Sequence, residues 1–155
     1  MDLEAELSTI LAALNAAGID HAVCGGVAVA IHGFVRTTKD IDLLVDGADL
    51  EDAVQALEAL GYTLDSGDIP FAVGTDEERH VRRISKAVGN DLLSVDLLQV
   101  CPVLRDVWES VEVFDWHGRQ ITVVSAGGLA KMKRLSGRPQ DLVDLKRLGL
   151  DEETK

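Results

Sequence analysis

Residues 24–46 read CGGVAVAIHGFVRTTKDIDLLVD and join two short apolar runs through a segment rich in alanine and valine. The pair Gly25-Gly26 follows the first run, and Asp40 and Asp42 open the second. Alternate residues of a strand face the same side, so the two aspartates share one face. Two carboxylates held that close repel each other unless a cation lies between them. The stretch therefore predicts two strands joined around an acidic site.

The composition is that of one ordinary globular domain. The chain has 155 residues, 46% hydrophobic and 27% charged, which is enough for its own core. A net charge of −12 and an aromatic content of 4% argue against a protein that coats nucleic acid or stacks bases. Cys24 and Cys101 lack metal-type spacing and indicate reduced thiols. With no signal-peptide pattern and no membrane-length apolar run, we expect a cytoplasmic protein without membrane contact.

The hydrophobic pattern predicts a chain of mixed helices and strands. Residues 65–78 hold five acids, two glycines and a proline without a clear period, so we expect a long loop there. Gly89-Asn90 predicts a hairpin turn. In chain order, helices are expected at residues 3–14, 27–32, 50–60, 103–110, 126–135 and 139–148, and strands at residues 19–24, 41–45, 62–64, 79–88, 92–100, 111–114 and 120–124.

This order of elements favours the α+β class, with α/β-like features. We expect a mixed central sheet flanked by helices, with a pair of helices at the C-terminus. The whole chain, residues 1–155, is expected to form a single domain. Residues 19–100 would be its motif-bearing core, and residues 101–150 would be a C-terminal hairpin with helices.

A third acid, Asp96, lies in the middle of the predicted strand at residues 92–100. That strand is apolar at almost every position and is therefore expected at the centre of the sheet. A carboxylate there must be paired, bound to a metal or placed at the open end of the sheet. If this strand neighbours the strand that carries Asp40 and Asp42, the three acids surround one point.

Three carboxylates around one point suit Mg²⁺, which takes phosphate oxygens and water as its remaining ligands. Two such ions could clamp the attacking and leaving oxygens of a phosphoryl displacement. Asp96 would then be the candidate base for an acceptor hydroxyl. The glycine pair Gly25-Gly26, where a strand passes into a helix, would hold a triphosphate through backbone N–H groups.

The glycine pair, a spacer of thirteen residues (27–39) and the Asp-Ile-Asp triplet at residues 40–42 resemble the motif of the nucleotidyltransferase superfamily. That superfamily includes the polymerase β palm, the aminoglycoside nucleotidyltransferases and members of bacterial toxin–antitoxin modules. The longer string GGVAVAIHGFVRTTKDIDLLV is most similar to a small bacterial branch that resembles the AbiEii-type toxins. The segment SAGGLAKMKRLSGRPQDLVDL, residues 125–145, fits the same branch. The resemblance covers roughly residues 19–148.

The resemblance implies a nucleotidyltransferase fold and Mg²⁺-dependent transfer of a nucleoside monophosphate from an NTP to a hydroxyl acceptor. An RNA 3′ end such as that of tRNA, a protein and a small molecule are all candidate acceptors. Asp40, Asp42 and Asp96 would be catalytic and bind the metal, with two ions present when NTP is bound. Gly25 and Gly26 would contact the phosphates.

The same resemblance implies further nucleotide-binding residues. Lys133 matches a lysine that reaches the nucleotide, and Asp141 matches the acid of a G-R-P-x-D turn. Arg36 stands four residues before Asp40 and is expected near the triphosphate, unless it forms a surface ion pair. Many relatives carry serine where this chain has Gly26, and Gly26 cannot supply the serine hydroxyl to a phosphate.

Several alternatives stay open at the level of sequence. The chain could act as a toxin–antitoxin component, or it could be a nucleotide-binding module of the same fold without turnover. A homodimer could provide the acceptor surface that a chain of this size lacks. The cluster Arg79, Arg82, Arg83 and Lys86 could guide an RNA or a nucleotide, or it could offset nearby acids.

Overall fold

The computed structural model describes residues 2–33 and 40–149. The helices are α1 (Leu3–Ala16), α2 (Gly25–Ile31), α3 (Leu50–Glu58), α4 (Arg105–Glu109), α5 (Ala126–Ser136) and α6 (Pro139–Arg147), with short 3₁₀ turns η1 (Gly47–Asp49) and η2 (Pro102–Leu104). The strands are β1 (His21–Cys24), β2 (Asp40–Val45), β3 (Leu64–Phe71), β4 (Arg79–Val88), β5 (Asp91–Gln99), β6 (Glu112–Trp116) and β7 (Arg119–Val123).

The seven strands form one mixed sheet in the order β3-β4-β5-β2-β1-β7-β6. The pairs β2–β5 and β1–β7 are parallel, and the other neighbouring pairs are antiparallel. The predicted α+β class, with its mixed central sheet and its C-terminal helical pair, is confirmed. Strands β5 and β2 occupy the interior of the sheet, which agrees with their apolar sequences.

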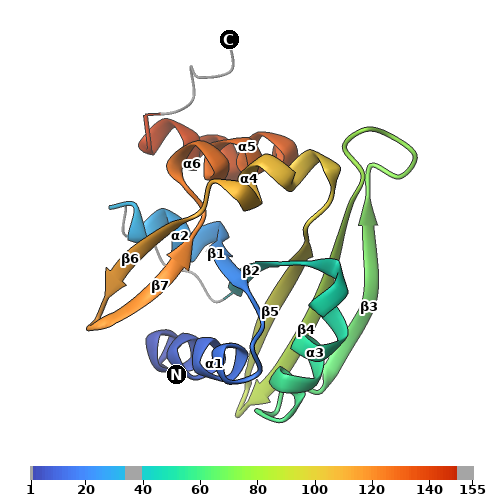
Figure 1. The fold of residues 1–155 in the computed structure, drawn as a ribbon, viewed down its shortest axis with the longest axis vertical. Helices are drawn as coiled ribbons and strands as arrows, with labels where there is room; N and C mark the ends of the chain where they lie inside the picture. The colour runs from blue at the N-terminus through green and yellow to red at the C-terminus, as the bar shows by residue number, and fades with distance from the viewer. Residues whose placement is uncertain (1, 34–39, 150–155) are drawn as a thin grey trace.

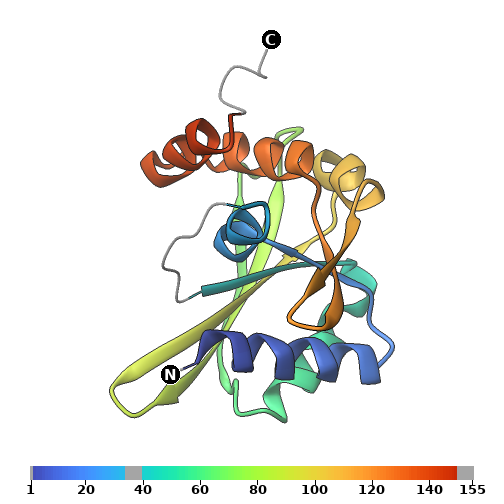
Figure 2. The ribbon, with the colours of Figure 1, turned by 90° about the vertical axis from the view of Figure 1, so that its left-hand side faces the viewer.

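Helices cover both faces of the sheet. Helices α1 and α3 lie on one face, whereas α2, α4, α5 and α6 gather on the other (Figure 1, Figure 2). The buried side of α1 consists of residues at helical spacing, each at most 1% exposed: Leu7, Ile10, Leu11 and Leu14. No described helix has both the length and the apolar sequence that a bilayer crossing requires.

The prediction of a long loop at residues 65–78 is wrong for its first half. Leu64–Phe71 is strand β3, which pairs with β4 at the edge of the sheet. Its register shifts between Asp65 and Asp68, and most of its residues are exposed, so no alternation of apolar residues marks it. An edge strand also accommodates Pro70, because the missing N–H faces no partner strand. Of the predicted strand at residues 62–64, only Leu64 lies in a strand, as the first residue of β3; Tyr62 and Thr63 follow the turn after α3, where Tyr62 N–H donates to the Leu57 carbonyl at 3.2 Å.

The C-terminal helices begin and end at residues that the sequence makes recognisable. The Ser125 hydroxyl accepts a hydrogen bond from Gly128 N–H at 3.0 Å and caps α5. Gly137 ends α5 in the left-handed conformation with φ of 63°. Pro139 occupies the first turn of α6, where its missing N–H is not needed. This tight turn sets α6 against α5 above the sheet (Figure 2).

Candidate functional site

Two of the three predicted acids stand side by side on neighbouring parallel strands. Asp42 of β2 is in register with Asp96 of β5, which confirms that the two strands are neighbours. Asp40 lies two residues earlier on β2, in register with Ser94, and is exposed. The sheet therefore brings the carboxylates of Asp42 and Asp96 together, with Asp40 at the end of the same strand.

The glycine turn after β1 lies directly against one of these carboxylates. Gly25 has a φ of +65°, a backbone conformation that residues with a side chain rarely adopt. A Cβ atom added at Gly25 would lie 1.9 Å from Oδ2 of Asp42. Gly26 is buried in the first turn of α2. Only a glycine at position 25 lets the backbone approach the acid this closely.

We expect the substitution Gly25→Ala to displace Asp42 and to destabilise the fold. Strain at positive φ and the clash should together lower the free energy of unfolding by about 2–4 kcal/mol. The matched control is Gly18→Ala, at φ of +71° with no atom within 4 Å of the added Cβ. That control carries only the backbone strain, about 1 kcal/mol. Urea denaturation of both variants measures the difference, and equal losses would contradict the contact between Gly25 and Asp42.

Asp42 is partly buried and sits in a strongly negative environment. Burial raises the pKa of its carboxyl to about 7, and the neighbouring charges of Asp96 and Asp40 act in the same direction. Lys133 and Arg138 oppose this shift without cancelling it. The negative charge at Asp42 is thus incompletely compensated, which is a property of sites that receive a cation.

Asp96 is bound by Arg83, a partner that was not predicted for it from the sequence. Arg83 of β4 donates from Nε to Oδ1 of Asp96 at 2.7 Å and from Nη2 to Oδ2 at 2.9 Å. The Asp96 side chain is 14% exposed, and that of Arg83 is 49% exposed. Register places Arg83 directly opposite Asp96, so the signal for this pair was the alternation of β4 together with its hairpin to β5.

A cleft of about 470 Å³ lies between the sheet and helices α5 and α6. Gly25, Asp42, Asp96, Lys133 and Asp141 all line it, so the structure brings these predicted site residues together. The cleft lining does not include Asp40. Arg36 falls outside the described residues. A cleft of this size fits a small ligand rather than a folded macromolecule.

Lys133 is buried among acids at the roof of the cleft. Its Nζ lies 3.2 Å from Oδ1 of Asp141 and 2.9 Å from Oδ2 of Asp144, and all three side chains are at most 6% exposed. Arg138 adds a hydrogen bond from Nε to Oδ2 of Asp141 at 2.8 Å. Burial raises the pKa of Asp141, but the bond from Arg138 and the charge of Lys133 outweigh it and hold that pKa below its usual value. This cluster ties α5 to α6, a role that sequence reasoning missed for Asp144.

The basic cluster of β4 is offset by acids and by an aromatic ring. Arg82 pairs with Asp65 at 2.7 Å and with Glu51 at 2.9 Å. Lys86 pairs with Glu6 at 2.7 Å, and the guanidinium of Arg79 lies 5.9 Å from the centroid of the Phe71 ring. Because Arg83 also has a carboxylate partner, β4 presents no continuous basic surface for a nucleic acid backbone. The structure favours the interpretation that the cluster balances nearby acids.

The donor set fits a hard divalent cation in part. Mg²⁺ usually takes one or two protein carboxylates and completes its shell with phosphate oxygens and water. The carboxylates of Asp42 and Asp96 supply such a pair. Burial first, and then the charges of Asp96 and Asp40, raise the pKa of Asp42, and a bound cation would offset both effects. Among the described residues, no three His, Cys, Asp or Glu side chains form a group that could hold a metal by themselves. The three-acid ligand set Asp40, Asp42 and Asp96 stays a prediction.

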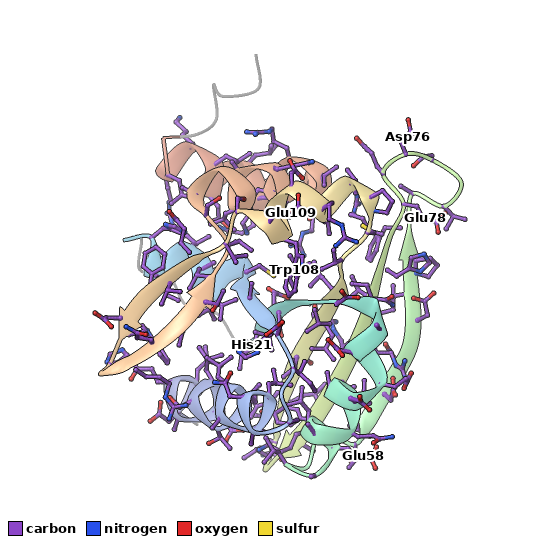
Figure 3. All side chains as sticks on the ribbon, viewed as in Figure 1. His21, Glu58, Asp76, Glu78, Trp108 and Glu109 are labelled. Carbon is purple, nitrogen blue, oxygen red and sulfur yellow. The ribbon has the colours of Figure 1, made fainter. Side chains whose placement is uncertain are left out.

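A second depression, of about 310 Å³, lies between the end of α1, the start of β1 and α4. Asn15, His21 and Trp108 are among its lining residues, and none of the predicted site residues is. Figure 3 labels His21 and Trp108 below α4, away from the loop between β3 and β4 that carries Asp76 and Glu78. The 470 Å³ cleft is therefore the one that coincides with the predicted chemistry.

Comparison with known families gives a match over most of the chain. The model of a family described as "Uncharacterised nucleotidyltransferase" matches residues 1–126. A search of curated protein sequences gives no significant match. The finer resemblance to AbiEii-type toxins stays a prediction.

Solved structures share the fold. The lincosamide antibiotic adenylyltransferase LnuA, with lincomycin bound, is 19% identical at a TM-score of 0.65, over 96% of this chain and 97% of that one. A Thermotoga maritima protein, provisionally assigned as a nucleotidyltransferase, is 17% identical at a TM-score of 0.62, over 91% and 88%. ANT(2")-Ia in complex with adenylyl-2"-tobramycin is 16% identical at a TM-score of 0.57, over 93% and 85%. At these identities the likeness concerns the fold, and the predicted fold is confirmed.

Proposed function

The chain belongs to the uncharacterised nucleotidyltransferase family, and from that premise we propose that it transfers a nucleoside monophosphate from an NTP to a hydroxyl of a small molecule. One observation carries the proposal. Asp42 and Asp96 are in register on adjacent strands at the floor of a cleft that also holds the backbone of Gly25. Phosphoryl transfer needs this combination of a backbone approach to phosphate and paired carboxylates beside the reacting phosphorus.

The proposed step is an in-line displacement at the α-phosphorus. The acceptor oxygen forms a bond to the α-phosphorus while the bond to the bridging oxygen of the β-phosphate breaks. Pyrophosphate leaves with that oxygen, and the hydroxyl proton passes to Asp96 as general base. The bidentate bond to Arg83 leaves Asp96 with spare acceptor capacity, because an ionised carboxylate offers about four lone-pair sites.

The other site residues would bind and orient the nucleotide. Backbone N–H groups of Gly25 and Gly26 would contact its phosphates, Arg36 would lie near the triphosphate, and Lys133 and Asp141 would also contact the nucleotide. Asp40 and Asp42, with Asp96, would hold Mg²⁺. When bound, Mg²⁺ would neutralise phosphate charge and polarise the phosphoryl group.

A small-molecule acceptor is favoured over RNA by the charge of the molecule. The net charge is −12, and the basic residues of β4 described above are engaged by acids and by the Phe71 ring. Solved structures of the same fold include one with lincomycin and one with adenylyl-2"-tobramycin. A toxin–antitoxin role, a protein or tRNA acceptor, a homodimer and a cytoplasmic location stay predictions from the sequence.

The test is pyrophosphate release from each of the four NTPs with Mg²⁺, against a panel of hydroxylated small molecules that includes lincomycin and tobramycin, with total RNA in parallel. Asp96→Asn should lower the rate about 10²–10⁴-fold, the usual contribution of a general base. Asp106→Asn is the matched control, since Asp106 is exposed and pairs with Lys131 outside the cleft. Nucleotide binding without any pyrophosphate release would instead support the non-catalytic module. Equal rates in the Asp96→Asn and native proteins would contradict the mechanism.

A further inference from the structure

The cleft changes character abruptly beside the acids. Asp96 and Arg83 face each other across β5 and β4, and the next pair on the same face is Leu98 and Val81. Ile69 of β3 continues that row opposite Val81. Residues two apart on a strand are separated by about 7 Å. The apolar row therefore begins about 7 Å from Asp96, at the pair Leu98 and Val81.

A second apolar wall faces this row from α5. The apolar shelf is the surface formed by six cleft residues from three strands and this helix: Ile69, Phe71, Val81, Leu98, Met132 and Leu135. Phe71 is 44% exposed, and the other five are only partly buried. An apolar surface that remains open to solvent beside a polar site is typical of a ligand subsite.

The direction of in-line displacement indicates which substrate lies on the shelf. The leaving pyrophosphate and the attacking oxygen must lie on opposite sides of the α-phosphorus. In the sheet order, Gly25 follows β1 on one side of the two acids, whereas β4 and β3 lie on the other. If the phosphates lie at Gly25, the acceptor approaches over β5, β4 and β3.

We infer that the acceptor is a hydroxylated small molecule with an aliphatic or aromatic portion, and that this portion lies on the apolar shelf while its hydroxyl reaches Asp96. The inference rests on the proposed function and narrows its acceptor. A wholly polar or polyanionic acceptor would leave the shelf exposed to water. The side chains of Phe71 and Ile69, on an edge strand, then determine which acceptors bind.

Methyl and hexyl β-D-glucopyranoside form a matched pair of probes, because they present the same hydroxyls and differ only in the alkyl chain. Their binding is measured by calorimetry on the full chain with Mg²⁺ and α,β-methylene-ATP, which cannot be cleaved at the α–β bridge. The hexyl compound should bind at least about 10-fold more tightly, since each buried methylene adds favourable transfer free energy. Phe71→Ser and Ile69→Ser should each reduce that ratio at least about threefold.

Leu64→Ser is the control variant. Leu64 lies on the same strand and is 54% exposed, close to the exposure of Phe71, but it is not part of the cleft. It should keep the full preference for the hexyl compound. Equal binding of the two glucosides, no binding of either, or an unchanged ratio in Phe71→Ser would overturn the inference. So would a Phe71→Ser variant that weakens binding of the ATP analogue instead, because the shelf would then hold the nucleotide.

Failure of the proposed function and failure of this inference give different experimental results. The glucoside measurement reports binding and needs no turnover, whereas the pyrophosphate assay reports turnover with any acceptor. A protein that prefers the hexyl compound but releases no pyrophosphate would support the apolar shelf as a binding site and contradict the proposed reaction. A protein that releases pyrophosphate but binds the two glucosides equally would support the proposed reaction and contradict the role of the apolar shelf.

Discussion

Asp42→Asn should strongly slow nucleotidyl transfer and, at pH 8, raise the melting temperature. The reaction should slow at least about 100-fold, because a charge that stabilises the transition state is removed. The fold should gain stability because the native carboxylate is partly buried beside Asp96 and Asp40, which raises its pKa from 3.8 to about 7. The amide has nearly the same shape and no charge to repel.

The pH dependence of this gain follows from the sign of the shift. Between pH 3.8 and 7 the folded state retains a proton on Asp42 that the unfolded state has lost, so native stability falls as pH rises through this window. Above pH 7 the penalty is complete, and near pH 4 it is almost absent. We therefore expect Asp42→Asn to melt roughly 3–6 °C higher than the native protein at pH 8, with little difference at pH 4.

The measurement is differential scanning fluorimetry in EDTA at both pH values, with pyrophosphate release measured separately. Asp52→Asn provides the control, since Asp52 is exposed on α3 and should change the melting temperature by less than about 1 °C. If the Asp42→Asn variant were less stable than the native protein at pH 8, the Asp42 carboxylate would stabilise the folded state, which would contradict the prediction. Retained transfer would remove Asp42 from the proposed mechanism.

Lys133→Ala should cause a large loss of stability. It leaves Asp141 and Asp144 buried without the ammonium that lies 3.2 and 2.9 Å from them. Removing one partner of a buried ion pair costs about 3–5 kcal/mol in the free energy of unfolding. The loss should shrink as pH falls, because the remaining carboxyls can then bind protons.

Lys131→Ala is the matched control on the same helix. Its partner Asp106 is 67% exposed, and exposed pairs contribute about 0–1 kcal/mol. The double variant Lys133→Met with Asp144→Leu should recover part of the loss, since it removes a buried charge together with its partner. Urea denaturation at pH 7.5 compares all three variants. Equal losses for Lys133→Ala and Lys131→Ala would show that the buried cluster does not hold α5 and α6 together.

The placement of Asp42 beside Asp96 could be predicted from sequence because the surroundings of both residues are regular. Asp42 and Asp96 each interrupt an apolar strand, and a charge in a central strand requires a reason. Gly25 was predictable for a similar reason, since a glycine between a strand and a helix indicates a close backbone approach. The hairpin of β4 and β5 followed from Gly89-Asn90.

The partners of these residues were harder to predict, because they depend on register and packing. Arg83 meets Asp96 only because β4 pairs with β5 in one particular register. From the sequence, Lys133 and Asp141 were expected at the nucleotide, yet the turn at Gly137 brings them together with Asp144 in a buried cluster. The Lys133 cluster leaves no periodic signal in the sequence, whereas the Arg83 partner follows from the register of the hairpin at Gly89-Asn90.

Strand β3 was not predicted because most of its residues are exposed, so no alternation of apolar residues marks it. The same exposure affects how the sequence of this strand can change during evolution. Six of its eight residues are exposed, so most substitutions there should change stability by less than about 0.5 kcal/mol. Positions such as Gly25 allow almost no change. A lineage of such chains could therefore vary the strand that borders the cleft and keep the acids of the central sheet intact. The architecture separates the part of the molecule that must be conserved from a part that is free to adapt.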